Sequence, residues 1–191
     1  MGRMSEIYFS GDIESNGPIP GTYSMLSFAA VAYNDSGEEL GCFSRNLDLL
    51  PGAKVHPKTQ LFWNDNKEAY NATRVNTVNP TLAMIDFRNW IESFQGSPVY
   101  VAYPAGFDFT FIYWYFMNFL DYCPFSHSAL DIKTLAMSLM GTDYRQSTKR
   151  NFPRKWFSKL PHTHVAEDDA REQGELFCNM WIRPNLKEYG N

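Results

Sequence analysis

The order of apolar segments along the chain is the feature that most constrains its fold. Alternating apolar and β-branched residues predict a first strand from residues 7–10 into the GDIE that follows, residues 11–14, and two more strands within residues 25–49. The polar turn at residues 34–37 joins the second and third strands. Because such a turn connects neighbouring strands that run in opposite directions, the sheet is expected to open with antiparallel strands.

After residue 57 the pattern changes to helices that alternate with short strands. Residues 143–161 predict a long loop before the last helix. The spacing of apolar residues and the flanking Pro and Gly predict the remaining elements: helices at 57–65, 80–94, 109–120, 133–140 and about 165–181, and strands at 99–103 and near 128–132. An antiparallel start followed by β-α alternation predicts a mixed α/β fold, with residues 1–191 forming a single domain.

The composition is that of a folded protein and excludes several classes. Apolar residues make up 44% of the chain and aromatic residues 16%, unlike a disordered protein. Three widely spaced cysteines, Cys42, Cys123 and Cys178, predict neither a disulfide framework nor a zinc site. They fit a reducing cytosol, so a cytoplasmic location is expected. The net charge of -4 predicts no broad attraction to polyanions, which leaves that role to local basic segments.

No membrane association is expected from the apolar segments. The most apolar run, residues 109–120, is shorter than the roughly 20 residues that a helix needs to span a bilayer. The amino terminus meets acid and glycine after a few apolar residues and lacks the apolar stretch of a signal peptide.

Acidic residues at three places in the sequence are candidates for one site. Asp12 and Glu14 are two apart, so in a strand both carboxylates point to the same face; the alternative is a polar strand end. Asp108 lies among aromatic residues, where a charged group needs a partner. The alternative for Asp108 is an N-cap of the helix that follows.

The third place pairs a histidine with an acid. His164 and Asp169 are five apart, and both can face one site if His164 lies in the loop that enters the last helix and Asp169 in the helix itself. Ala166 and Ala170 leave room for close backbone packing there. The alternative is a solvated helix start whose acids favour the positive end of the helix dipole.

Together these residues would supply four carboxylates and one imidazole. Four carboxylates in one pocket repel one another, and hard divalent cations such as Mg²⁺ or Mn²⁺ would keep them ionised at neutral pH. Two such ions about 4 Å apart can clamp the attacking and departing oxygens of an in-line phosphoryl displacement. A histidine beside them can deprotonate the attacking water.

The order of these motifs resembles that of the DEDDh 3′-to-5′ exonucleases, the superfamily of ribonuclease T, oligoribonuclease and the proofreading subunits. The first family motif, DxE followed by small polar residues and Gly, is matched by DIESNG at residues 12–17. The second, an acid after a small-residue turn and Phe, is matched by AGFD at 105–108. The third and most specific, HxAxxDA, is matched by HVAEDDA at 164–170, and the three span nearly the whole chain in family order.

The resemblance implies a ribonuclease-H-like fold, with a mixed five-stranded sheet whose first three strands are antiparallel and whose other strands are parallel, and helices on both faces. It implies that two Mg²⁺ or Mn²⁺ ions are held by four carboxylates and that His164 is the general base. The implied metal ligands are Asp12, Glu14, Asp108 and Asp169.

The resemblance also bears on neighbouring residues. It places Ser15 and Asn16 beside the terminal nucleotide of the substrate. His162 and Asp168 do not fit the HxAxxD spacing and are interpreted as accessory or surface groups. Asp131 matches a family position where an acid commonly begins a helix, so it is assigned to capping.

The chain departs from the family pattern at residues 103–104. Members often have His-Asn there, whereas this chain has Tyr-Pro, which removes a backbone donor and stiffens the turn before Asp108. The four acids are retained, so the departure concerns substrate contacts more than the chemistry.

The segment at residues 143–161 interleaves cations with aromatic residues. That combination suits phosphate contact and base stacking in single-stranded nucleic acid, so Arg154, Lys155 and Trp156 are predicted to bind substrate. The alternative is a solvated surface loop whose aromatic residues are tucked into the core.

The leading interpretation is a metal-dependent exonuclease that releases nucleoside 5′-monophosphates from the 3′ end of single-stranded RNA, DNA or short oligonucleotides. The alternative from another class is a noncatalytic nucleic-acid-binding module, which usually lacks one of the acids or the histidine; this chain has all five. A third alternative is an acidic α/β scaffold in which the motifs occur by chance, and it would require all three motifs to arise in family order by coincidence. Family members are frequently homodimers, so the resemblance also implies dimerisation.

Overall fold

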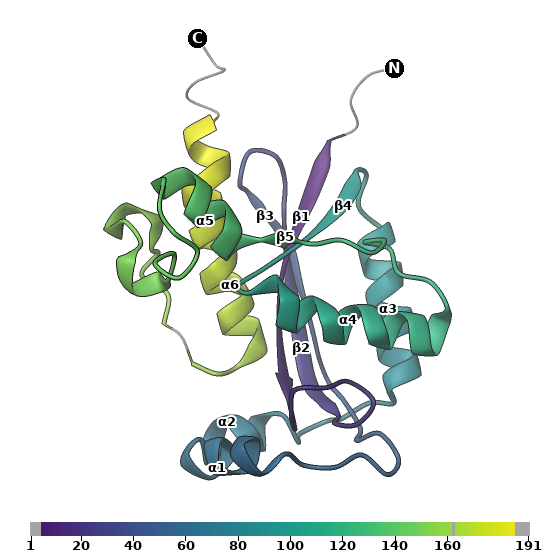
Figure 1. Cartoon of the computed structure of the whole chain (residues 1–191). Coiled ribbons are helices and arrows are strands. Elements are labelled where there is room, and N and C mark those ends of the chain that lie inside the picture. The colour runs from purple at the N-terminus through teal and green to yellow at the C-terminus, as the bar shows by residue number, and fades with distance from the viewer. Residues whose placement is uncertain (1–4, 162, 186–191) are drawn as a thin grey trace.

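A mixed five-stranded sheet forms the centre of the molecule, for which the computed structural model describes residues 5–161 and 163–185. The strand order is β3-β2-β1-β4-β5 (Figure 1). β2 pairs antiparallel with β1 and β3, whereas β4 is parallel to β1 and to β5. The predicted fold class is confirmed. The strands are β1 (Glu6–Ser15), β2 (Met25–Tyr33), β3 (Glu39–Asn46), β4 (Ser97–Ala102) and β5 (Leu130–Asp131).

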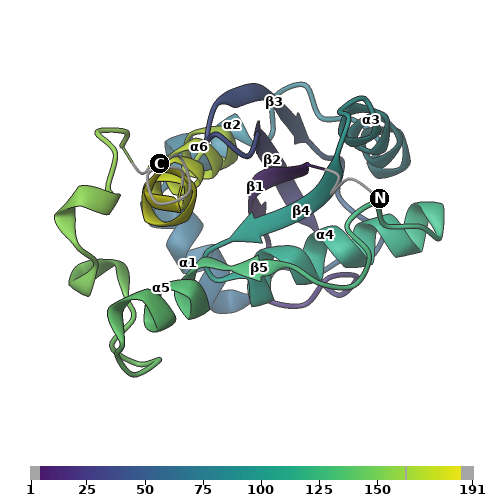
Figure 2. The same ribbon diagram turned by 90° about the horizontal axis from the view of Figure 1, so that it is seen from above.

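Helices cover both faces of this sheet. Figure 2 shows α6 on one side of the sheet and α3 and α4 on the other. The helices are α1 (Pro57–Asp65), α2 (Lys67–Ala72), α3 (Pro80–Glu92), α4 (Ala105–Leu120), α5 (Ile132–Met140) and α6 (Ala166–Phe177). Two 3-10 turns, η1 (Lys149–Asn151) and η2 (Arg154–Trp156), precede α6, and a π-helical segment, η3 (Cys178–Ile182), continues it. Within the described ranges, no helix has both the length and the apolar character needed to cross a bilayer.

The sheet separates two apolar clusters, and β1 contributes to both. Phe9 and Ile13 belong to the cluster under α3 and α4, whereas Tyr8 belongs to the cluster under α6. Side chains alternate along a strand, so Asp12 and Glu14 lie on the same face as Tyr8, toward α6. The prediction that these two acids share one face is confirmed, because β1 extends through residue 15 and includes both of them.

α4 begins at residue 105, earlier than the predicted start near residue 109. Asp131 explains the difference, because its carboxylate accepts the backbone N–H of Ala105 at 2.9 Å and so satisfies one of the free donors of the first turn. The same carboxylate accepts the N–H of Thr134 at 2.8 Å and caps α5, as predicted. Asp108 therefore lies inside the first turn of α4, and its interpretation as an N-cap is wrong.

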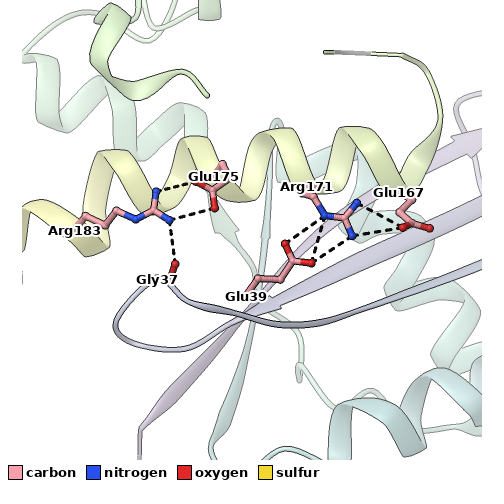
Figure 3. A network of polar contacts seen from close by, with 6 residues as sticks. All are labelled: Gly37, Glu39, Glu167, Arg171, Glu175 and Arg183. Atoms are coloured by element: carbon pink, nitrogen blue, oxygen red, sulfur yellow. Dashed lines mark hydrogen bonds and ion pairs between the residues drawn. The ribbon is translucent and has the colours of Figure 1, made fainter. Parts of the chain in front are cut away.

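Two arginines fasten α6 to the edge of the sheet (Figure 3). Each guanidinium joins a glutamate of α6 to the hairpin formed by β2 and β3. Arg171 contacts Glu39 at 3.3 Å and Glu167 at 3.4 Å, and Arg183 contacts Glu175 at 2.8 Å and the Gly37 carbonyl at 3.1 Å. Partly exposed ion pairs are individually weak, so we interpret this network as fixing the position of α6 rather than as a large source of stability.

Candidate active site

α6 contacts the sheet directly beside the acidic pair of β1. Gln173 of α6 donates its side-chain N–H to the carbonyl of Gly11, next to Asp12, and accepts the N–H of Tyr103 at 2.9 Å. Glycine is required at residue 11, because a Cβ there would lie 2.2 Å from the hydroxyl of Tyr100. This close packing holds Asp12 between β4 and α6.

Asp108 reaches the same region from the opposite layer. It is buried, with 5% of its surface exposed, and its carboxylate accepts the backbone N–H of Ile13 at 3.2 Å. Ile13 stands between Asp12 and Glu14 in β1, so this bond brings the third acid to the first two. The buried carboxylate thus has the partner that its aromatic surroundings require.

Asp169 and His164 are arranged by a tight turn before α6. His164 has a positive φ of 58°, and its backbone N–H points at the Asp169 carboxylate, 3.0 Å away. The N–H of Thr163 reaches the other oxygen of Asp169 at 2.8 Å. Asp169 is only 3% exposed, which argues against a solvated helix start. His164 lies in the entry loop and Asp169 in the helix, as predicted.

These segments converge on one point. One oxygen of Glu14, one oxygen of Asp169 and one ring nitrogen of His164 lie within 4.8 Å of one another. The ring of His164 also packs edge-on against Phe62 of α1, with 5.2 Å between the ring centroids. Residues from β1, α1 and the start of α6 therefore meet at the end of the sheet.

The carboxylates of the cluster affect one another's charge. Burial, followed by the charges of Asp169 and Asp108, raises the pKa of Glu14 to about 8. Burial raises the pKa of Asp108 to about 7, although the N–H of Ile13 opposes the shift. The pKa of Asp12 is raised well above its usual range by burial and then by the other three carboxylates. Such a cluster stays ionised at neutral pH only with a cation present.

The donor set fits a hard divalent cation. Carboxylate oxygens dominate it, with one imidazole at its edge, and this is the ligand chemistry that Mg²⁺ and Mn²⁺ prefer. None of the three cysteines belongs to the cluster of candidate ligands found among the described residues. Glu14, Asp169 and His164 therefore form a candidate metal-binding group. Asp12 and Asp108 are not part of that group of three, but they interact with its acids through charge.

A cavity of about 350 Å³ opens next to Glu14, at the end of β1. Its walls come from β1, the loop after it, α1 and the first turn of α4, and they include the aromatic side chains of Phe62, Trp63 and Phe107. Trp63 is buried and donates its ring N–H to the Ser15 carbonyl at 3.1 Å, whereas Phe62 and Phe107 are each 38% exposed. These aromatic residues are not among those predicted from the sequence; the adjacent Phe62-Trp63 pair in a short predicted helix is the signal that could have found two of them.

The other predicted substrate contacts near β1 lie as follows. Ser15 lines the cavity, and its hydroxyl donates to the Gly17 carbonyl at 2.9 Å. Asn16 is 3% exposed and its backbone bonds to Ser24 and His56, so little of it is left to touch a substrate.

The residues interpreted as accessory groups flank the turn before α6. Asp168 is exposed and accepts the Thr163 hydroxyl at 2.8 Å, in keeping with a surface role. His162 lies outside the described residues.

The basic segment, residues 143–161, runs over the surface as the predicted loop and contains only the short turns η1 and η2. Arg154 and Lys155 are exposed. Trp156 is 6% exposed and packs against Phe152 in the cluster under α6. The prediction that Trp156 stacks on a base is wrong for this conformation, because the core covers the ring.

Comparisons with known proteins agree with this geometry. No family model matches the chain. The 3′-5′ DNA exonuclease Cap18 of Escherichia coli is 32% identical over 177 residues, which cover 90% of this chain and 90% of that protein.

Solved structures share the fold at low sequence identity. The nuclease domain of 3′hExo, a DEDDh family member bound to rAMP, has a TM-score of 0.68 and 10% identity over 95% of this chain and 94% of that one. Exonuclease I of E. coli, solved with single-stranded DNA, has a TM-score of 0.65 and 15% identity over 98% of this chain and 43% of that one. With the fold, the three motifs and the relationship to Cap18 in agreement, the chain belongs to the DEDDh family of 3′-5′ exonucleases.

Proposed function

We propose that this exonuclease removes nucleoside 5′-monophosphates from the 3′ end of single-stranded DNA by metal-dependent hydrolysis. The convergence of Glu14, His164 and Asp169 within 4.8 Å is the observation that carries the proposal. The charge of Asp108 acts on Glu14, and the charges of all three other acids act on Asp12. The name of Cap18 favours DNA over RNA. Exonuclease I, which has the same fold, was solved with single-stranded DNA.

Asp12, Glu14, Asp108 and Asp169 are the proposed ligands of two Mg²⁺ or Mn²⁺ ions. When bound, the ions offset the negative charge of the reacting phosphate and of the oxygens that attack and leave it. The raised pKa values of Glu14 and Asp108 support this role. Carboxylates that are buried and repel one another destabilise the fold, and a bound cation would offset that repulsion.

His164 is the proposed general base. Its ring accepts a proton from the water whose oxygen attacks the phosphorus of the last linkage. The bond from phosphorus to the 3′ oxygen of the penultimate nucleotide then breaks, and that oxygen takes up a proton. The turn that bonds the His164 N–H to Asp169 and the edge-on contact with Phe62 hold the imidazole in place.

The cavity beside Glu14 is the proposed site for the terminal nucleotide. Its volume of about 350 Å³ lies within the range of small-molecule sites. Phe62 and Phe107 each leave 38% of their surface exposed at its wall, so a base can stack on them. Stacking on aromatic rings tolerates any base, which suits an enzyme that shortens strands of mixed sequence.

Arg154 and Lys155 remain proposed phosphate contacts. Trp156 is not proposed as a substrate contact, because its ring is buried. Both cations are exposed on the basic segment, which leads directly into His164.

Dimerisation remains a prediction, which light scattering on the purified protein tests.

The proposal is tested with single strands of DNA and RNA labelled at the 5′ end and incubated with Mg²⁺ or Mn²⁺. We expect a ladder of strands shortened from the 3′ end, faster for DNA, with 5′-monophosphates as the released product. Asp12→Asn is expected to abolish the ladder and His164→Ala to slow it by about 10²- to 10⁴-fold. Asp35→Asn, which changes an exposed acid in a distant turn, is the control. Equal rates for Asp12→Asn and the native protein would overturn the proposal.

A further inference from the structure

An ion pair joins the basic segment to the catalytic helix. The ammonium of Lys149 lies 2.5 Å from a carboxylate oxygen of Glu172, three residues beyond Asp169 in α6. The side chain of Glu172 is 9% exposed, whereas that of Lys149 is 31% exposed. The acid is therefore held inside the protein, and part of the cation faces outward.

Tyr103 places this pair beside Asp12. The hydroxyl of Tyr103 accepts the backbone N–H of Lys149 at 3.3 Å, and its ring centroid lies 5.6 Å from the ammonium. In the parallel ladder of β1 and β4, Ser10 pairs with Val101, and Asp12 and Tyr103 each lie two residues beyond that pair on the same face. In keeping with this placement, the charge of Lys149 lowers the pKa of Asp12 against the larger effects of burial and neighbouring acids.

A second cavity, of about 480 Å³, is lined by Tyr103, Lys149, Phe157 and Glu172. It shares no lining residue with the cavity beside Glu14, which β1, α1 and α4 enclose. The first cavity therefore adjoins Glu14. The second lies toward Asp12, because Tyr103 and Lys149, which line it, are beside that residue. A strand whose last linkage lies at the carboxylates would have its terminal nucleotide in the first cavity and its penultimate nucleotide toward the second.

We propose that Lys149 binds the phosphate on the 5′ side of the penultimate nucleotide and that Glu172 is a positioning residue that holds its ammonium there. The proposal rests on the function proposed above. An ammonium has three N–H donors, so Glu172 can occupy one and leave others for a phosphate. The competing explanation is that the ion pair only pins the basic segment to α6.

The two explanations are separated by a double-mutant cycle in which one change is a substitution in the protein and the other replaces one charged phosphate of the DNA by an uncharged linkage. The probe is a single-stranded DNA of ten nucleotides with a methylphosphonate in place of the second phosphate counted from the 3′ end. The rate of removal of the terminal nucleotide is measured in single turnover for the native protein, Lys149→Met and Glu172→Gln. A strand with the neutral linkage at the fifth position is the substrate control, and Lys149→Arg is the conservative variant.

For the native protein, we expect the neutral second linkage to slow removal by about tenfold, the order of a charge-assisted hydrogen bond. Lys149→Met should slow cleavage of the normal strand by a similar factor and show no further loss on the modified strand, because both changes remove the same contact. Lys149→Arg should keep most of the discrimination. Glu172→Gln keeps the cation but removes the carboxylate that positions it, so it should lower the discrimination between the two strands without abolishing it.

Two results would overturn the proposal. One is an equal response to the neutral second linkage in the native protein and in Lys149→Met. The other is the loss of discrimination in Glu172→Gln to the same extent as in Lys149→Met, as expected if the ion pair only pins the segment. Each variant is compared with itself on two strands, so a fraction of misfolded protein cancels. Failure of the native protein to shorten any of the strands would overturn the proposed function instead.

Discussion

The carboxylate of Asp108 accepts the backbone N–H of Ile13 at 3.2 Å, although 95 residues separate them. Ile13 is flanked by Asp12 and Glu14, so this bond links the first turn of α4 to the acidic pair of β1. The same carboxylate is one of the four proposed metal ligands. The contact therefore has a structural part, the accepted hydrogen bond, and a chemical part, the negative charge.

Two substitutions of Asp108 separate these parts. Asp108→Asn keeps an oxygen that can accept the Ile13 N–H, whereas Asp108→Ala leaves this buried donor without it, at a cost of about 1–3 kcal/mol in the free energy of unfolding. Both variants should lose exonuclease activity, and only Asp108→Ala should lose stability in urea denaturation. Equal stability of the two variants would contradict the structural part, and an active Asp108→Asn would contradict the chemical part.

The stability of the metal-free protein should fall as the pH rises from about 5 to 8. Burial and neighbouring carboxylates raise the folded-state pKa of Glu14 from 4.5 to about 8 and that of Asp108 from 3.8 to about 7. Between those values the folded protein binds more protons than the unfolded chain, so the free energy of unfolding decreases with pH. The measurement is the melting temperature in EDTA across this range.

Metal should reverse that loss at the alkaline end. Binding to the folded state alone stabilises it by mass action, and it releases the protons held by Glu14 and Asp108. We expect Mn²⁺ to raise the melting temperature more at pH 8 than at pH 5. A melting temperature in EDTA that rises toward pH 8, or an equal effect of Mn²⁺ at both values, would count against the account.

The exposed ring of Phe62 should contribute to substrate binding. Phe62→Ala removes one wall of the cavity beside Glu14, and stacking of a base on an aromatic ring contributes about 1–3 kcal/mol. The expected result is a fall in kcat/KM of about 5- to 150-fold on single-stranded DNA. Leu61→Ala is the matched control, because Leu61 is 64% exposed and does not line the cavity. Similar kinetics for the two variants would remove Phe62 from the site.

The exposed cations of η2 should act through charge alone. Replacing Arg154 and Lys155 by Gln is expected to weaken binding of single-stranded DNA and to lower the slope of log affinity against log salt by about 1.4, at about 0.7 per phosphate contact. Fluorescence anisotropy over a salt series measures both quantities. Arg88→Gln, on α3 across the sheet, is the control. Unchanged affinity at low and at high salt would exclude these residues from the interface.

The sequence was enough to predict the parts of this site that depend on local geometry. The spacing of Asp12 and Glu14 places both on one face, because strand side chains alternate. The positions of His164 and Asp169 on either side of a helix start also follow from their spacing, whereas the capping role of Asp131 was implied by the family resemblance. That Asp108 would meet the β1 acids was implied only by the family resemblance, because nothing local links residues 95 positions apart.

The errors come from packing that the sequence does not display. Trp156 sits among cations, as a stacking residue would, but the cluster under α6 covers it. The start of α4 was placed too late because the donor at Ala105 is satisfied by Asp131, which comes 26 residues later. Phe62 and Phe107 belong to different helices, and only the folded chain brings them to one cavity.

The central claim is that four carboxylates from β1, α4 and α6 hold a pair of divalent cations. Crystals grown with Mn²⁺ test it directly through anomalous scattering from the metal. We predict two peaks about 4 Å apart, bounded by Asp12, Glu14, Asp108 and Asp169. An occupied manganese site elsewhere on the protein with no density at these four residues would contradict the account.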